Sequence, residues 1–299
     1  MSLRIANAPA SWGIEPPDPP QDPPWERVLE DIAASGYEGT ELGPFGYLPT
    51  APEELTAGLE RHGLHLAAGF VMEAFSDRTK HDAIERTARR TCELLQAGGA
   101  KTLILIDAVS PDRVGAAGRS DAAPRLSPGG WTALLDGLRR VAEVASESGL
   151  TVAIHPHVGT HIEFEDEVDR VLADLDPALV GLCPDTGHST YAGIDPVSLL
   201  DRHAQRLAYV HFKDIDAGRL AAARTERLSF PQAVARGIFR PLGDGSVDFA
   251  AVAARLAAIG YSGWATVEQD RLPDDSSTPV QEARRSLAYL REIGLADSA

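Results

Sequence analysis

Eight short apolar runs recur along this chain of 299 residues and alternate with stretches of helical periodicity. The runs that predict strands cover residues 3–8, 37–42, 64–70, 101–106, 151–155, 179–183, 207–212 and 263–268. Helical periodicity is clearest over residues 24–35, 81–96 and 131–148. Strands that are apolar almost throughout are typical of a parallel sheet covered by helices. We therefore predict an α/β fold, a single (β/α)8 TIM barrel over residues 1–295, with a frayed tail at 296–299.

Glycine recurs at the helix-to-strand junctions "ASGYEGTEL", "RHGLHLAAGF", "QAGGAKTLILI", "ESGLTVAIH" and "AIGYSGWATVE". Glycine adopts the left-handed conformation that ends a helix, so each junction predicts a helix cap followed by a strand. The alternative is a doubly wound sheet, which usually has a Gly-rich phosphate loop after its first strand. Here the proline-rich segment "NAPASWGIEPPDPPQDPPWERV" stands in that place, which favours the barrel.

Two long segments, residues 107–128 and 214–247, follow predicted strands. They would lie on the face where barrels keep their active sites, and we expect either substrate lids or interface loops.

Charge and cysteine content narrow the class of protein. The chain has 44 acidic and 28 basic residues and a net charge of −16, which disfavours nucleic acid and anionic membranes as partners. Two cysteines are too few for a disulfide framework. We find neither a secretory leader nor the roughly 18 consecutive apolar residues of a membrane helix. We expect a soluble, cytoplasmic protein.

Polar residues gather at the ends of the last four predicted strands, in "AIHPH", "CPDTGH", "VHFKD" and "TVEQD". Strand ends of a barrel meet near its axis, so residues about thirty apart in sequence can bind one ion. Imidazole with carboxylate suits Mn²⁺, Co²⁺, Fe²⁺, Zn²⁺ or Ni²⁺. The sequence therefore predicts a divalent metal site on this rim, which carries the residues His155, His157, Asp185, His188, His211, Lys213, Asp214, Glu268, Gln269 and Asp270.

The order of "DTGH", "HFKD" and "VEQD" resembles the xylose-isomerase-like barrels, which include sugar isomerases, ketose 3-epimerases, inosose isomerases and dehydratases, and AP endonucleases. The segments "NAPASWGIE", "HPHVGTHIE" and "LGDGSVDF" are most similar to the inosose dehydratase branch of inositol catabolism. The resemblance implies metal ligands at Asp185, His211 and Glu268, and Mn²⁺ or Co²⁺ as the favoured ion. The fourth position, a glutamate in the epimerases, aligns with His155; His157 and Glu163 are alternatives for the fourth ligand.

This resemblance implies a metal-dependent dehydratase, a carbon-oxygen lyase acting on a keto-cyclitol such as scyllo-inosose. A proton next to the carbonyl is removed and a β-hydroxyl is expelled. We expect Glu268 or His157 as base and His188 or Lys213 as acid or oxyanion partner. Three further residues are expected to bind the substrate, with Trp12 either stacking on a ring or closing the barrel mouth: Glu41, Trp12 and Gln269.

The sequence is also compatible with two other functions. One is an isomerase or epimerase of an unphosphorylated ketose or inosose, because it starts with the same proton abstraction. The other is a non-catalytic sugar-binding barrel. An AP endonuclease is disfavoured, because the strand ends "TELGP" and "AAGFVMEA" lack the further histidines that its metal site needs. The partner is then a small polyhydroxylated carbonyl compound, and related barrels also suggest a homo-oligomer.

Overall fold

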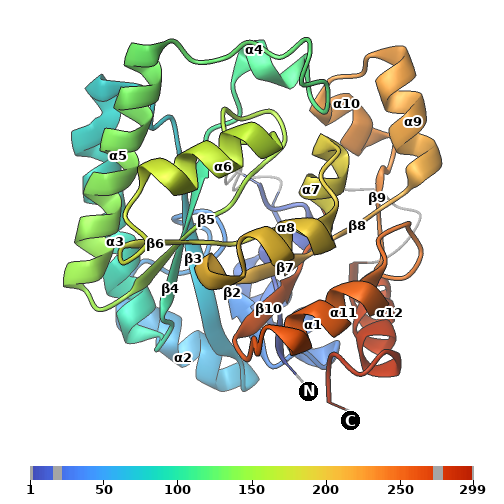
Figure 1. The fold of residues 1–299 in the computed structure, drawn as a ribbon. Coiled ribbons are helices and arrows are strands. Elements are labelled where there is room, and N and C mark those ends of the chain that lie inside the picture. Colours follow the sequence, from blue (N-terminus) through green and yellow to red (C-terminus); the bar gives the residue numbers. More distant parts are fainter. Residues whose placement is uncertain (1–2, 16–21, 272–278, 298–299) are drawn as a thin grey trace.

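Eight parallel strands form one sheet in the computed structural model, which describes residues 3–15, 22–271 and 279–297. Their order is β6-β5-β4-β3-β2-β1-β10-β7 (Figure 1). The strands are β1 (Arg4–Asn7), β2 (Gly39–Glu41), β3 (His65–Glu73), β4 (Thr102–Asp107), β5 (Thr151–Ile154), β6 (Val180–Leu182), β7 (Val210–Phe212) and β10 (Trp264–Val267). Isolated parallel bridges, Leu182 to Leu207 and Asp185 to His211, join the edge strands β6 and β7. The sheet closes, and the predicted (β/α)8 barrel is confirmed.

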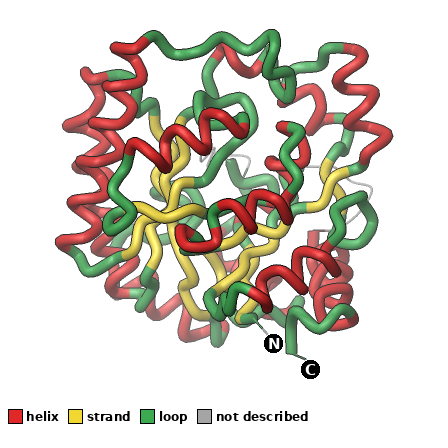
Figure 2. Tube along the Cα trace, viewed as in Figure 1, coloured by secondary structure: helices red, strands yellow, loops and turns green. Residues whose placement is uncertain are grey.

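Helices surround this sheet and pack their apolar faces on it (Figure 2). The longer ones are α1 (Trp25–Ala34), α2 (Pro52–His62), α3 (His81–Ala97), α5 (Pro128–Glu147), α6 (Glu165–Asp174), α11 (Phe249–Ala258) and α12 (Pro279–Glu292). The shorter α7 (Thr186–Ala192) and α8 (Pro196–Arg202) lie between β6 and β7. Short 3-10 turns are η1 (Pro9–Trp12), η2 (Arg78–Lys80) and η3 (Ala204–Arg206). The three helices predicted from periodicity are present with nearly the expected ends.

The glycines at the helix-to-strand junctions have the predicted backbone geometry. At the five quoted junctions the backbone φ is positive, between 65° and 91°, at Gly36, Gly63, Gly99, Gly149 and Gly260. A side chain with a Cβ atom is strained in this region, so glycine ends each helix and turns the chain into the next strand.

The two long segments are more ordered than their sequence indicates. Residues 107–128 contain α4 (Pro111–Val114), and residues 214–247 contain α9 (Ala217–Glu226), α10 (Phe230–Ala235) and the two-stranded ribbon β8 (Asp214–Ile215) and β9 (Phe239–Arg240). A second apolar cluster joins Ala117, Val158 and Tyr191 to buried residues of α9 and α10. These short elements pack on other loops, so their apolar residues show no long periodic pattern.

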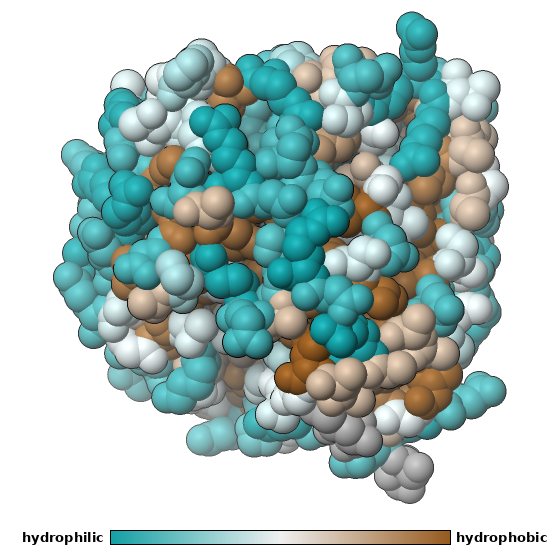
Figure 3. Space-filling model, viewed as in Figure 1, coloured by the Kyte–Doolittle hydropathy of each residue, from teal (hydrophilic) through white to brown (hydrophobic). Residues whose placement is uncertain are grey.

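The C-terminal tail is not fully exposed. Of the four residues expected to fray, Ala296 is buried, and 298–299 lie outside the described residues. The outer face over α5 and α6 is largely hydrophilic, which agrees with the charge of the chain (Figure 3). Among the described helices, none combines the length and apolar character needed to cross a bilayer.

A single carboxylate fastens the segment 214–247 to the barrel. Asp214 is fully buried and accepts hydrogen bonds from four backbone N–H groups, those of residues Ile215, Gly243, Gly245 and Val247, at 2.9 to 3.0 Å. A buried carboxylate is stable only when such donors surround it. The motif "LGDGS" therefore forms the anion-binding turn that receives Asp214.

We expect Asp214→Ala to lower the free energy of unfolding by at least about 2 kcal/mol, because four buried donors lose their acceptor. Asp214→Asn should have a smaller effect, because the amide keeps one accepting oxygen. Urea denaturation measures both. The control Asp244→Ala removes a surface ion pair with Arg285 and should change stability by less than about 1 kcal/mol. Equal losses at the two positions would contradict the anchoring role.

Candidate metal centre

Four side chains from four neighbouring strand ends meet at the C-terminal mouth of the barrel. His155 follows β5, Asp185 is the N-cap of α7 after β6, His211 lies in β7, and Glu268 follows β10. All four are buried, and one ligand atom of each lies within 4.8 Å of the others. The parallel register brings them together, because His211 pairs with Thr266 on one side and Asp185 on the other.

Hydrogen bonds orient both imidazoles toward the middle of this group. His155 Nδ1 lies 2.8 Å from the carbonyl oxygen of Pro156, which only accepts, so Nδ1 carries the proton. His211 Nε2 likewise donates to Glu41 Oε1 at 2.9 Å. His155 Nε2 then keeps its lone pair, and both His155 Nε2 and His211 Nδ1 lie 4.0 Å from Asp185 Oδ2. His211 Nδ1 also lies 3.3 Å from Glu268 Oε2, and although burial opposes it, Cys183, Glu268 and Glu41 raise the pKa of His211 well above its usual value. Without a metal Nδ1 therefore carries a proton, which a bound cation would displace. An outer partner that holds a histidine in this way is typical of metal sites.

Unpartnered atoms and unbalanced charge show that the group fits a cation. Asp185 Oδ2 and His211 Nδ1 are buried and have no hydrogen-bond partner among the described residues. Burial lowers the pKa of His155 well below its usual value, so its imidazole is neutral. The ammonium of Lys213 faces three buried carboxylates, those of Asp185, Glu268 and Asp270, and a fourth, that of Glu41, lies against His211. A divalent ion would offset most of the remaining negative charge.

A second cluster lies beside the first. Lys213 is 1% exposed, and its Nζ lies 2.6 Å from Asp270 Oδ1, 2.9 Å from His188 Nε2 and 3.2 Å from Glu268 Oε2. The rings of His188 and His157 are in contact, with centroids 3.9 Å apart and their planes tilted by 40°. Burial lowers the pKa of His157 to about 4, so this imidazole is neutral at pH 7. Although burial opposes it, Asp185, Asp270 and Glu268 raise the pKa of Lys213, which stays charged.

A cavity of about 620 Å³ reaches this second cluster. Its polar lining residues include His157, Asp270, Glu15 and Arg271. Its walls are apolar and come from the loops and strands around the mouth, with Phe45, Phe70, Met72, Val109 and Phe230 among them. Asp270 had no role assigned from the sequence, although it lies two residues after Glu268 and thus on the same side of the chain. No sequence signal identifies Phe230, which enters from α10.

The structure places the three expected substrate-binding residues away from this cavity lining. Glu41 is fully buried and holds His211, as described above. Trp12 is packed in the main apolar core, and its indole N–H donates to Asp31. Gln269 donates through its side chain to Glu282 of α12. Substrate contact by these residues stays a prediction that their present positions do not support, and closure of the barrel mouth by Trp12 likewise stays a prediction.

Other candidates are also engaged elsewhere. Glu163, one alternative for the fourth ligand, accepts from the backbone of Gly118 and Gly159 and lies outside the four-residue group. His161 is a loop residue beside Asp107. Lys213 does not form the solvated pair with Asp214 that adjacent charges in the sequence allow: it is buried and bonded to Asp270.

The glycine of "DTGH" makes room for this lysine. A Cβ atom at Gly187 would lie 2.7 Å from Lys213 Cγ and 2.9 Å from its Cβ. Real Cβ atoms do not approach this closely, so only glycine lets the aliphatic part of Lys213 pass α7 toward Asp270. The motif therefore combines a candidate ligand, Asp185, with the space that the ammonium requires.

The fold and the four-residue group together define a TIM barrel that can hold a divalent ion at the C-terminal ends of its strands. The model of the xylose isomerase-like TIM barrel family matches residues 29–293. An inosose dehydratase of Geobacillus kaustophilus is 37% identical over 97% of this chain and 94% of its own length. The rhizopine catabolism protein MocC of Rhizobium meliloti is 37% identical over 92% of this chain and 84% of its own. The chain therefore belongs to the xylose isomerase-like TIM barrel family.

Solved structures agree on the fold. The IolI protein with a bound zinc atom superposes with a TM-score of 0.74, covering 97% of this chain and 98% of its own. The two sequences are 16% identical, so this likeness bears on the fold alone.

Gly187→Ala should destabilise the protein by about 1 to 3 kcal/mol through the clash with Lys213. This sign is the reverse of the usual effect, because replacing glycine by alanine inside a helix normally stabilises by roughly 0.5 to 1 kcal/mol. The matched control is Gly129→Ala near the start of α5, where a Cβ would meet only Ser127 Oγ at 4.0 Å. Urea denaturation measures the free energy of unfolding of both variants. A stabilised Gly187→Ala protein would contradict the close packing.

Proposed function

We propose that this protein is a metal-dependent dehydratase that removes water from a keto-cyclitol such as scyllo-inosose. Its relatives make it an enzyme of the carbon-oxygen lyase or sugar isomerase/epimerase type. The observation that carries the proposal is the neutral His157, which lines the cavity next to the buried Lys213, Asp270 and His188 cluster. A base and a cationic proton donor are thus held side by side, as an elimination requires.

The proposed metal ligands are His155, Asp185, His211 and Glu268. Their mixed imidazole and carboxylate atoms suit Mn²⁺ or Co²⁺, and Zn²⁺, Fe²⁺ and Ni²⁺ are compatible. The bound ion would act as a Lewis acid on the substrate carbonyl or an adjacent hydroxyl. Glu41 supports this role from outside the group by accepting from His211 Nε2, which turns Nδ1 toward Asp185 and Glu268.

His157 is the proposed base. Its Nδ1 lies 2.8 Å from the carbonyl oxygen of Val158, so Nδ1 carries a proton and Nε2 keeps its lone pair. Nε2 would take the proton from the carbon next to the carbonyl. Glu268 is less suited, because it already contacts His211 and Lys213 at 3.3 and 3.2 Å.

Lys213 is the proposed acid. It lies between the four-residue group and Asp270 at the cavity wall, where an ammonium can donate to an oxygen held at the group. The bond from the β-carbon to its hydroxyl breaks as Lys213 supplies the proton, and the ring loses one hydrogen and one hydroxyl as water. His188 Nε2 accepts a hydrogen bond from the same ammonium and keeps it in place.

An isomerase or epimerase on the same scaffold is the second candidate. The epimerases of this family use carboxylates on both faces of the sugar, one from the strand-five position. Here that position is His155, whose Nε2 lies 4.0 Å from Asp185 Oδ2, so the strand-five carboxylate is absent. This difference favours elimination.

Protein stripped of metal by a chelator should be inactive toward scyllo-inosose, and added Mn²⁺ or Co²⁺ should restore growth of the ultraviolet absorbance of a conjugated dione. Asp185→Asn should bind less metal in equilibrium dialysis and stay inactive after metal is added. If the wild-type protein shows no growth of absorbance with any of the metals, inosose dehydration is rejected. An NMR screen of ketoses and inososes for proton exchange beside the carbonyl would then test the second candidate.

His157→Gln should lower kcat by about 10²- to 10⁴-fold, because the general base is lost while the metal ligands remain. Metal content measured by mass spectrometry should be unchanged. His161→Gln is the matched control, since His161 belongs to the same loop but contacts Asp107. Full activity of His157→Gln with full metal content would remove His157 from the mechanism.

A further inference from the structure

The loop that follows β5 carries the proposed base and closes on itself. The backbone N–H of His157 donates to the carbonyl of Ile162 at 3.0 Å, and the hydroxyl of Thr160 donates to the carbonyl of His157 at 2.8 Å. Any shift of residues 157–163 as a unit therefore moves the imidazole of His157. The position of the base depends on what holds this loop from outside.

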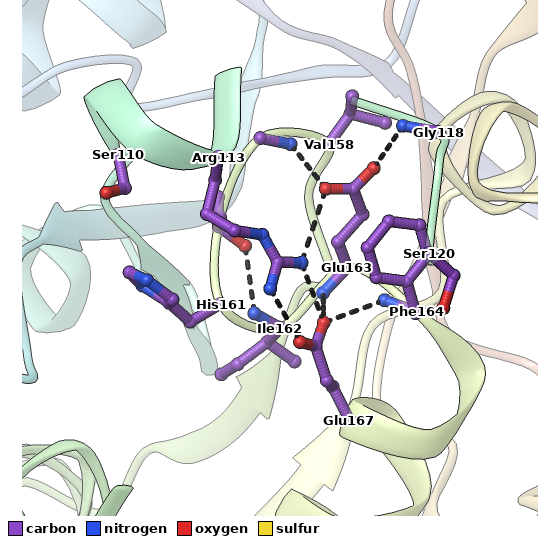
Figure 4. A network of polar contacts seen from close by, with 12 residues as sticks. Ser110, Arg113, Gly118, Ser120, Val158, His161, Ile162, Glu163, Phe164 and Glu167 are labelled. Atoms are coloured by element: carbon purple, nitrogen blue, oxygen red, sulfur yellow. Dashed lines mark hydrogen bonds and ion pairs between the residues drawn. The ribbon is translucent and has the colours of Figure 1, made fainter. Parts of the chain in front are cut away.

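A buried arginine from the segment 107–128 holds the loop of residues 157–163. The side chain of Arg113 in α4 is fully buried, and its two terminal nitrogens donate to the two oxygens of Glu167 at 2.7 and 3.0 Å (Figure 4). One of these nitrogens also lies 3.5 Å from Glu163 Oε2. Two parallel bonds from one guanidinium fix both direction and distance, which a single ammonium does not.

Glu163 passes this restraint to the loop. One of its oxygens accepts from the backbone N–H of Gly118 at 2.7 Å (Figure 4). The other accepts from the backbone N–H of Gly159 at 3.0 Å. Gly118 belongs to the segment 107–128, and Gly159 lies two residues after His157. The carbonyl of Gly159 in turn accepts from the N–H of Ser110 at 2.9 Å. The segment after β4 and the loop after β5 are thus joined through Arg113 and Glu163.

We propose that Arg113, acting through Glu163, is the positioning residue that keeps His157 in place for proton abstraction. The proposal rests on the function proposed above. Arg113 touches neither the cavity lining nor the four-residue group, so its effect reaches the reaction only through the loop. The segment 107–128 is then a fixed wall that supports the base, and not a lid.

Arg113→Met should lower kcat by about 10- to 100-fold with a smaller change in KM and with full metal content. Arg113→Lys should recover only part of the loss, because an ammonium cannot bond both oxygens of Glu167 in parallel. The control is Arg125→Met. Arg125 also contacts Glu167, but it is 37% exposed and bonds neither Glu163 nor the loop, so kcat should be nearly unchanged. A similar loss in Arg125→Met and Arg113→Met would overturn the proposal.

A double-mutant cycle separates positioning from general damage. In a His157→Gln background, Arg113→Met should cause no further loss of kcat, because the group that it positions is gone. An undiminished further loss in this background would overturn the proposal. Should Arg113→Met fail to fold, Glu163→Gln serves in the same cycle, since it weakens the bonds to Gly118 and Gly159 while keeping the size of the side chain.

An activity-independent measurement distinguishes failure of this proposal from failure of the proposed function. In ¹⁵N-labelled protein, the imidazole nitrogen shifts of His157 report its hydrogen bond to Val158. These shifts should change in Arg113→Met and stay constant in Arg125→Met. Unchanged shifts in Arg113→Met would overturn the positioning role. Changed shifts with an inactive wild-type protein would uphold it and reject the dehydratase.

Discussion

Lys213 places an ammonium group where it is 1% exposed, between the carboxylates of Asp185, Glu268 and Asp270. Burying a charge is tolerated only when opposite charges and hydrogen-bonding groups surround it. The other features of the mouth follow from this requirement. Gly187 leaves space for the lysine stem, and the carboxylates that surround the ammonium also leave an excess of negative charge beside it. The divalent ion and the lysine are thus two parts of one charge arrangement.

The loops around the mouth are held by the same physical means. Asp214 fastens the segment 214–247 through four backbone donors, and Arg113 fastens the segment 107–128 through Glu163 and Glu167. Between them lies the second apolar cluster, which includes Val158 of the loop after β5. Directional bonds set the position of each loop, and apolar packing excludes water between them. A site built in this way is organised before a substrate arrives, which is the arrangement that catalysis favours.

Much of the architecture and the site could be predicted from local patterns. Periodicity and the glycine junctions predict all eight barrel strands, and the ends of the last four strands carry the four residues that the structure brings together. The partners of these residues could not be predicted in the same way. Glu41 reaches His211 across 170 positions of sequence, and Arg113 reaches Glu167 across 54. Such pairings depend on side-chain direction in the closed barrel, which no local pattern encodes.

The sequence by itself determined the barrel, the rim on which the chemistry lies and the types of residue there, because strand periodicity and helix capping are set by near neighbours in the chain. Only the tertiary structure decided that Lys213 is buried with Asp270, that Glu41 supports His211 from outside, and that Glu163 holds a loop and stays apart from the candidate ligands. The physical reason is desolvation. A charged side chain at the mouth of a barrel is stable only beside partners of opposite charge, and those partners come from strands and loops far apart in the chain.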